Sequence, residues 1–332
     1  MRPKAAAAKP RVSRAGDAFL HGVALALNAV ADITLRCEGL AEFLPKAERL
    51  IKRHDLGSTL GGPRGGPGFD VTPDRSGSIE DGYGAALDAL ARGVDFGRMR
   101  ASEGSVAVVG YMMERNEGDH RGNVGELERM LHALELEPAA VWLSGRPLEH
   151  LLQARRASAI VSLPHGRAAG HVLAQRLGVK LVEAELPFGL EATRRFMELL
   201  GREFGRNAAA ANFIEAELDA AVLRLQWSVP HAFLGRRFAF VGDRHYLRGF
   251  TELIDELGGT MAGAHEAELV AANTYVLDGA GADAARVEFG YPSECEHVLH
   301  EAPFLGFPGA LALSTRLANE MVKGFYRRRG KP

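Results

Sequence analysis

Three side chains that could transfer protons each follow a short apolar run. Asp119 and Asp243 lie in polar segments after the runs VAVVG and FAFVG, and His165 follows the run AIVSLP. An imidazole at such a position could donate a proton or act as an axial ligand, and carboxylates also transfer protons. His165, Asp119 and Asp243 are therefore the candidate catalytic residues. The alternative for His165 is an ordinary residue of a surface turn.

A second group of reactive side chains surrounds Cys295 in the segment YPSECEHVLHE. Thiolate and imidazole groups bind soft or borderline metals, and Cys295 is followed closely by His297. If the segment is a loop, Cys295 and His297 could hold a metal or cofactor. The alternative is an exposed acidic turn that leads to Pro303. The other potential ligands of the segment are Glu294, Glu296 and His300.

The elements that would position these residues form a unit that occurs twice. Each copy has an apolar strand ending in glycine, Gly110 or Gly242, followed by a polar loop and an amphipathic helix. The duplication predicts an α/β fold with two doubly wound, Rossmann-like parallel sheets. Ligands of such folds lie beyond the carboxyl ends of the strands. Gly110, Gly242 and Gly166, which follows His165, are therefore candidate cofactor-binding positions.

The remaining sequence predicts three regions. They are a truncated N-terminal α/β region, a central Rossmann-like domain with a long helical connection, and a C-terminal Rossmann-like domain, spanning 1–100, 101–229 and 230–332. Expected strands are 33–35, 106–109, 140–143, 159–162, 180–182, 238–241, 274–277 and 287–289. Expected helices include 18–30, 41–54, 190–227 with a break near 205–207, and 309–325. The Gly- and Pro-rich stretch 57–78 is expected to be a long loop without regular structure, serving as a lid or an interface arm or remaining disordered.

Composition limits the function classes. A chain of 332 residues with 46% apolar content can bury substantial cores, and a net charge of -2 argues against nucleic-acid binding. No apolar run reaches the ~20 residues of a membrane span, and the N-terminal Ala tract is broken by Lys and Pro, unlike a signal peptide. We therefore expect a cytoplasmic protein without a membrane partner. Neither G-x-G-x-x-G nor G-x-x-x-x-G-K-[ST] occurs, so no nucleotide site is expected in this chain.

Longer segments resemble one family. The stretch from LHALELEPAAVWLSG to LPFGLEATRRFMELLG resembles the middle domain of nitrogenase component 1 and its relatives, the dark-operative protochlorophyllide and chlorophyllide reductases and related tetrapyrrole reductases. The ending EFGYPSECEHVLHEAPFLGFPGALALSTRLANEMV is similar to the family's closing segment. GVALALNAVADITLRCEG is similar to the opening segment that leads to a cluster-binding cysteine. The resemblance covers about two-thirds of the chain, with a shortened N-terminal domain.

The resemblance implies an iron–sulfur cluster at a subunit interface, but the cysteine pattern departs from the family. Glu42 stands near the expected cysteine, and Cys37 lies a few residues upstream. Asp55 is a further metal candidate, because aspartate replaces one cysteine ligand in some relatives. The loop around Cys295 and His297 faces the substrate or cofactor cavity in the family. With two cysteines in the chain, a four-thiolate cluster needs two chains or help from carboxylate and histidine.

Two hypotheses remain open from the sequence. In the first, the chain is a subunit of a component 1-like oxidoreductase that pairs with itself or with a homologous chain. It would receive electrons from a nitrogenase-iron-protein-like ATPase reductase and reduce a tetrapyrrole or another small unsaturated substrate. In the second, it is a cluster-less scaffold or carrier descended from that family. A third hypothesis is a small-ligand binding protein that resembles periplasmic metal-chelate receptors. It is disfavoured because no export signal is recognisable.

Overall fold

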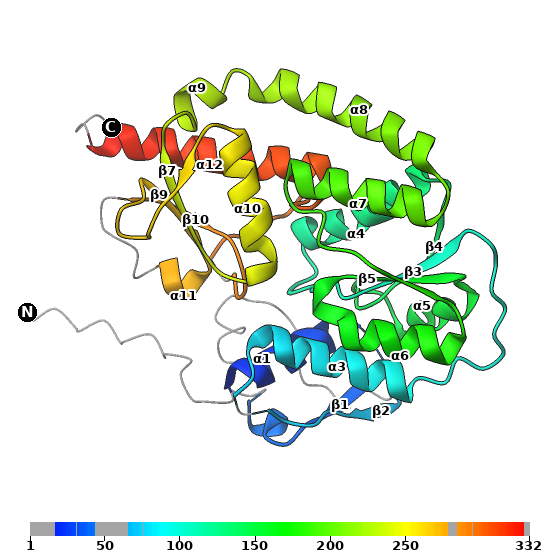
Figure 1. The fold of residues 1–332 in the computed structure, drawn as a ribbon. Helices are drawn as coiled ribbons and strands as arrows, with labels where there is room; N and C mark the ends of the chain where they lie inside the picture. The colour runs from blue at the N-terminus through cyan, green and yellow to red at the C-terminus, as the bar shows by residue number, and fades with distance from the viewer. Residues whose placement is uncertain are drawn as a thin grey trace, which may run out of the picture.

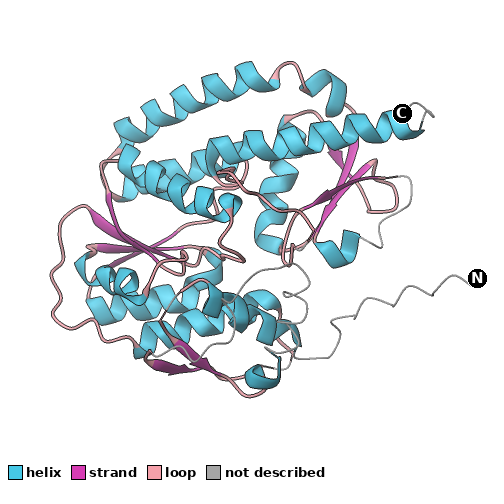
Figure 2. Ribbon diagram, turned by 180° about the vertical axis from the view of Figure 1, so that it is seen from behind, coloured by secondary structure: helices cyan, strands magenta, loops and turns pink. Residues whose placement is uncertain are grey.

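The computed structural model describes residues 17–30, 32–43, 66–74, 76–277, 284–293 and 295–328. Two four-stranded parallel sheets stand side by side, and the N-terminal helices and the long helices α8 and α12 lie at opposite ends of the molecule (Figure 1). The view from behind shows the same arrangement (Figure 2). The predicted α/β fold with two separate doubly wound sheets is confirmed.

The central sheet forms from short apolar strands alternating with helices. All five residues of β3 are buried, as expected for a parallel strand covered on both faces. The strand order is β4-β3-β5-β6, and every pairing is parallel. The elements are β3 (Ser105–Val109), α4 (Gly118–Ala133), β4 (Glu137–Val141), α5 (Leu148–Leu152), η1 (Gln153–Arg156), β5 (Ala159–Ser162), η2 (Pro164–Gly166), α6 (Arg167–Leu177) and β6 (Lys180–Glu183).

The C-terminal sheet repeats this topology. Its order is β10-β9-β7-β8, so in both sheets the first strand lies between the second and the third. The elements are β7 (Arg237–Val241), α10 (Arg244–Glu256), β8 (Thr260–Met261), β9 (Leu269–Ala272), α11 (Thr274–Leu277) and β10 (Ala285–Glu288). The doubly wound arrangement has one topological switch point per sheet, between β3 and β5 and between β7 and β9.

One predicted strand is wrong. Residues 274–277 form the short helix α11, and the strand lies earlier, at Leu269–Ala272, where all four residues are buried. Asn273 explains the change of structure, because its side-chain oxygen accepts a hydrogen bond from the N–H of Val276 at 3.0 Å. This is the geometry of a helix N-cap, which ends the strand and starts a helix.

The N-terminal region contains α1 (Asp17–Asn28), β1 (Thr34–Arg36), β2 (Gly68–Asp70) and α3 (Ile79–Gly93). The strands β1 and β2 pair in parallel, and α3 packs between α1 and α6 of the central unit. The expectation that 57–78 is a loop without regular structure is therefore wrong for residues 68–70, which form β2. At the end of this stretch, Ser78 forms a capping box with Asp81 and so begins α3. The expected helix 41–54 is seen only at its start, because residues 44–65 lie outside the described residues.

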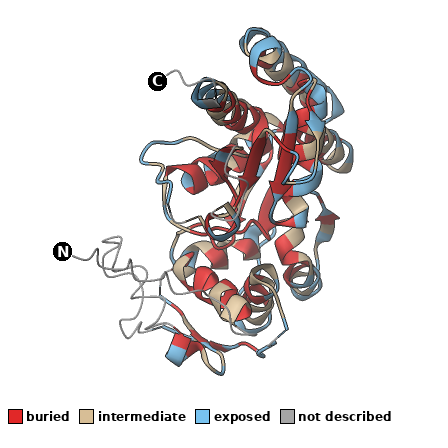
Figure 3. Cartoon of the chain, turned by 90° about the vertical axis from the view of Figure 1, so that its left-hand side faces the viewer, coloured by how far each residue is buried: buried red, intermediate tan, exposed pale blue. Residues whose placement is uncertain are grey.

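Long helices join the two sheets into one packed body. They are α7 (Leu190–Glu203), α8 (Asn207–Leu225) and α12 (Gly306–Arg328), and the short helix α9 (Val229–Ala232) follows α8. The helix α12 packs on β9 and β10 of its own sheet and on α4, α7 and α8 beyond it. Buried residues concentrate in the sheets and in the helix faces turned toward them (Figure 3). None of the described helices is both long and apolar enough to span a membrane. The boundaries at 100 and 229 stay a prediction.

Candidate functional site

The two switch points bring polar residues of both sheets together. His165 follows β5 in the helical turn η2, and Asp243 follows β7 as the N-cap residue of α10. The Nε2 atom of His165 lies 2.5 Å from Oδ2 of Asp243, across 78 positions of sequence. Both side chains are almost completely buried, at 0% and 1% exposure. A surface turn, the alternative for His165, is therefore wrong.

The carboxylate of Asp243 is held from both sides. Its Oδ1 accepts a hydrogen bond from the N–H of His245 at 2.8 Å, which caps α10, while Oδ2 faces His165. Burial alone would raise the pKa of Asp243, but the hydrogen bond and charge of His165 and the N–H of His245 outweigh it and lower the pKa. Asp243 is therefore an anion in a buried position.

His245 completes a cluster of three potential ligands. Its ring stands edge-on to the ring of His165, with 5.1 Å between the centroids. One ligand atom of each of His165, Asp243 and His245 lies within 4.8 Å of the other two. The second ring nitrogen of His165, Nδ1, is buried and has no hydrogen-bond partner among the described residues. We call these three residues the histidine cluster.

The glycines near this cluster are accounted for by packing. Gly110 has φ +92°, and a Cβ atom there would lie 2.4 Å from the backbone nitrogen of Gly166. The two backbones thus touch directly, which fixes the turn that carries His165. At the exposed Gly242, a Cβ would approach the Phe240 ring to 2.8 Å. Cofactor contacts at these three glycines stay a prediction.

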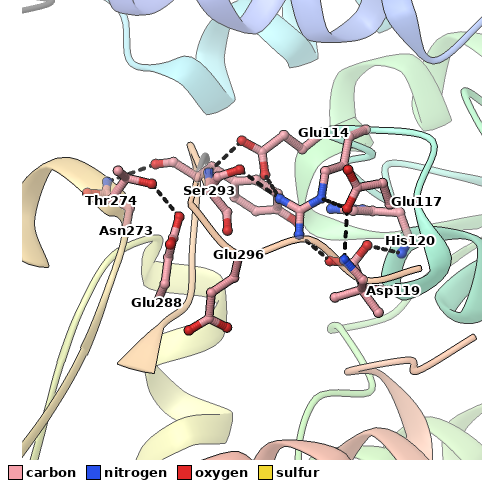
Figure 4. A network of polar contacts seen from close by, with 12 residues as sticks. Glu114, Glu117, Asp119, His120, Asn273, Thr274, Glu288, Ser293 and Glu296 are labelled. Carbon is pink, nitrogen blue, oxygen red and sulfur yellow. Dashed lines mark hydrogen bonds and ion pairs between the residues drawn. The ribbon is translucent and has the colours of Figure 1, made fainter. Parts of the chain in front are cut away.

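Asp119 belongs to a second polar group, the Arg115 network, centred on the loop after β3. The guanidinium of Arg115 contacts Glu117 at 3.1 Å and Asp119 at 2.7 Å and donates to the carbonyl of Ser293 at 2.7 Å. Ser293 in turn donates its N–H to Glu114 at 2.7 Å. Figure 4 shows Glu114 beside Ser293, which lies in the segment after β10, and shows Glu117 and Asp119 on the other side of the network. The network therefore joins the two units.

One carboxyl group of this network stays protonated near neutral pH. Burial raises the pKa of Glu114 to about 8, and the charges of Asp119 and Glu288 reinforce the shift against the opposing charge of Arg115. Glu114 and Glu288 line a cavity of about 30 Å³ together with Arg115 and Asp119. A cavity of this size holds one or two water molecules. A buried acid beside water is able to give and take a proton.

Aromatic residues connect the two polar groups. The ring centroid of Tyr246 lies 6.3 Å from that of His165 and 5.9 Å from that of Tyr291. The ring centroid of Tyr291 in turn lies 6.1 Å from that of His120. Burial lowers the pKa of His120 to about 4, so its ring is neutral. Asn123 donates a hydrogen bond to the Tyr111 hydroxyl at 2.7 Å, and the same hydroxyl lies 2.7 Å from Nδ1 of His120.

Sequence reasoning missed most of these partners. No hydrophobic periodicity in the sequence distinguishes the following residues from ordinary loop residues: Glu114, Arg115, His245 and Tyr291. The signal that existed was position: His245 follows the predicted strand end by four residues, and Glu114 and Arg115 follow Gly110 in the same way. Polar residues just after the first strand of a doubly wound sheet are positioned at its ligand-binding edge.

Residues 71–268 match the family model of nitrogenase component 1 type oxidoreductases. The chain belongs to this family. The matched stretch contains the whole central sheet, the helices α7 to α9 and the first two strands of the C-terminal sheet.

Solved structures agree with this assignment. A structure of nitrogenase Cp1 at pH 6.5 has a TM-score of 0.65 and 15% identity, and the match covers 89% of this chain and 76% of that one. A structure of nitrogenase Cp1 at pH 5 has a TM-score of 0.56 and 12% identity, with coverage of 87% and 68%. At these identities the likeness shows the fold. A search of curated proteins gives no significant match.

The two cysteines of this component 1 type protein lie in different structural units. Cys37 follows β1 and is partly buried, whereas Cys295 is exposed in the loop after β10. Glu42 is exposed within the helical turn 40–43, and Asp55 lies outside the described residues. His297 pairs with Glu117 at 2.7 Å, so it joins the Arg115 network. The N–H of Cys295 donates to Glu288.

The donor set does not fit a four-thiolate iron–sulfur cluster within one chain. Such a cluster needs four cysteine ligands, and the chain has two, on different structural units. Burial, together with the charge of Glu38, also raises the pKa of Cys37. Its thiol is therefore a weaker ligand than an ordinary cysteine until a metal displaces the proton. Any cluster of this kind requires donors from a second chain.

Proposed function

We propose that this chain is a subunit of an oxidoreductase that adds electrons and protons to a small unsaturated substrate, a tetrapyrrole being the leading class. The observation that carries the proposal is the buried pair His165–Asp243, which joins the ligand-binding edges of both sheets. Reduction of an unsaturated bond consumes protons as well as electrons. A buried imidazole–carboxylate pair can hold a proton at that edge.

The buried carboxyl group of Glu114 supports the same proposal. With a pKa of about 8 it is protonated at neutral pH, and it lies beside the small cavity. Asp119 is held by Arg115 and positions this loop rather than acting alone. In our proposal the cavity of about 30 Å³ holds water beside Glu114, because it is far too small for a tetrapyrrole.

Electrons reach the substrate through partners. Proteins of this family typically bind metal clusters, oligomerise and work with a component 2 reductase. In our proposal this chain pairs with a second copy or a homologous subunit, and the two together supply the ligands of a cluster. Cys37 is the ligand that this chain contributes. A separate ATP-dependent reductase delivers the electrons in the cytoplasm, and the chain itself binds no nucleotide.

The proposal is tested on full-length protein purified without oxygen, alone and with a component 2 type reductase and ATP. We expect iron and sulfide only in the oligomeric fraction, a visible charge-transfer spectrum, and reductase ATP hydrolysis that increases when this protein is added. A protein without iron that leaves ATP hydrolysis unchanged under all these conditions would overturn it. Size-exclusion chromatography at micromolar concentration, run in parallel, detects the oligomer.

The second candidate is a cluster-less scaffold or carrier. The shortage of thiols favours it, as does the dense packing of aromatic rings between the sheets, for example Phe188 on Phe289 at 5.3 Å. A scaffold would bind the homologous subunit or the reductase without iron. The iron assay therefore separates the two functions, and the pairing assay alone does not.

A further inference from the structure

We propose that the histidine cluster of His165, Asp243 and His245 is a binding site for one divalent transition metal ion of the Zn²⁺ class. The site contains no cysteine and lies at the contact of the two sheets. It is therefore distinct from the iron–sulfur cluster considered under the proposed function. The metal and the proton that the proposed function assigns to His165–Asp243 use the same atoms, so they occupy the pair alternately.

The donor set fits such an ion. Two imidazole rings and one carboxylate provide three ligands, a combination used by sites for zinc and other divalent first-row metals that keep a further position open. One ligand atom of each residue lies within 4.8 Å of the others. Among the described residues, His165, Asp243 and His245 form the one group of three or more His, Cys, Asp or Glu side chains whose ligand atoms lie this close together.

The backbone segments that carry the ligands are held in place before a metal binds. Asp243 uses Oδ1 to cap α10 through the N–H of His245, so Oδ2 alone is turned toward His165. The backbone contact between Gly110 and Gly166 holds the turn of His165. Ligands held by packing and by outer hydrogen bonds lose little freedom on binding, which raises affinity.

Only a small movement is needed to admit the ion. Ligand atoms ~2.1 Å from a tetrahedral zinc lie roughly 3.4 Å from one another. The Nε2 atom of His165 and the Oδ2 atom of Asp243 are 2.5 Å apart, so they must separate by about 1 Å, which small side-chain rotations supply. With the ion bound at Nε2, the imidazole of His165 is a neutral ligand that carries its single hydrogen on Nδ1.

The imidazole of His165 has few other polar partners. Its Nδ1 atom is buried and without a hydrogen-bond partner among the described residues, although buried polar atoms are normally paired. Its burial therefore depends on the contact with Asp243 alone. His245 is half-buried, whereas the other two ligands are fully buried, so the ion enters from the side of His245.

The consequence is a metal that bridges the two units. His165 comes from the central sheet, and Asp243 and His245 come from the C-terminal one. An ion bound to all three would hold the two sheets together. Bound metal should therefore raise the melting temperature, by roughly 5 °C at a hundredfold excess over Kd.

The test uses full-length protein stripped with a chelator and titrated with Zn²⁺, and with Co²⁺ as a spectroscopic probe. We expect one ion per chain with a Kd in the micromolar range or below, d–d absorption from Co²⁺, and a higher melting temperature. His245→Ala should weaken binding at least tenfold, and Asp243→Asn at least as much. His171→Ala is the matched control, because His171 forms an exposed pair with Glu183 at 3.2 Å.

Two results would overturn the site. One is the absence of stoichiometric binding by the stripped protein. The other is binding that His171→Ala weakens as much as His245→Ala does, since this marks adventitious surface histidines. If Asp243→Asn fails to fold, His245→Ala decides the question, because the half-buried His245 side chain is not part of the His165–Asp243 pair. Activity with a reductase plays no part in this test, so its failure and that of the proposed function are distinguishable.

Discussion

The hydroxyl group of Tyr291, just after β10, donates a hydrogen bond to the carbonyl oxygen of Met112, just after β3, at 3.1 Å. Because that proton is committed, the hydroxyl of Tyr246 must donate to Tyr291, at 2.9 Å. A chain of hydroxyl groups thus connects α10 and the loop after β10 with the ligand-binding edge of the central sheet. All of these side chains are buried.

Tyr291→Phe should therefore lower the free energy of unfolding by roughly 1–3 kcal/mol, because it leaves the Tyr246 hydroxyl and the Met112 carbonyl without partners in a buried place. Urea unfolding followed by circular dichroism measures the change. Tyr326→Phe is the control, since Tyr326 is 48% exposed, and it should have little effect. Equal effects of the two substitutions would contradict the role of the hydroxyl chain.

Asp243→Asn should lower the free energy of unfolding most at pH values above the ordinary pKa of an aspartate. The folded-state pKa of Asp243 is lowered, so its contribution is fully present above the unfolded value near 3.8 and is lost as the pH falls through the folded value. Unfolding in chelator at several pH values measures this, with the exposed Asp255→Asn as the control. The difference between wild type and Asp243→Asn should shrink toward low pH, and a constant difference would refute the account.

Glu114→Gln should change the pH dependence in the opposite sense. The folded-state pKa of Glu114 is raised to about 8, so the folded protein binds its proton more tightly than the unfolded chain. Stability then falls as the pH rises from about 4.5 to about 8, with a slope of up to ~1.4 kcal/mol per pH unit. The Gln variant should lack this slope. Parallel curves for the two proteins between pH 5 and 8 would exclude a buried neutral Glu114.

Gly110→Ala should destabilise the fold far more than Gly97→Ala. Both glycines have positive φ, +92° and +58°, but only Gly110 lies against backbone, with a Cβ contact of 2.4 Å, whereas nothing lies within 4 Å of Gly97. The strain at Gly97 costs roughly 1–2 kcal/mol. Thermal unfolding compares the two variants. Similar melting temperatures would mean that the turn of His165 adjusts easily.

Cys37→Ser should abolish any iron bound by protein prepared without oxygen, and Cys295→Ser should leave the iron content nearly unchanged. Cys37 lies in the segment that resembles the cluster region of the family, while Cys295 is exposed in the loop after β10. Inorganic iron and sulfide assays on both variants decide this. If Cys295→Ser loses the iron and Cys37→Ser keeps it, the assignment of the ligand is reversed.

The sequence by itself determined the two α/β units. Apolar runs ending at Gly110 and Gly242 are long enough to be buried and short enough to be strands, so local pattern was sufficient. The pattern predicts the wrong element where two local signals compete. Asn273 ends the strand β9 and caps α11, although the apolar residues that follow it have the pattern of a strand.

The pairing of His165 with Asp243 was decided only by tertiary structure. The sequence placed each residue after a strand, and parallel strands put both at ligand-binding edges, but no local rule says which edges face each other. That orientation depends on the contacts of α7, α8 and α12 with one another and with the helices α4 and α10 of the two units, which bring together residues 78 positions apart. The same packing brought His245 to the pair and buried Glu114 deeply enough to raise its pKa. Local sequence does not predict either result, because burial is a property of the assembled molecule and not of the segment that carries the side chain.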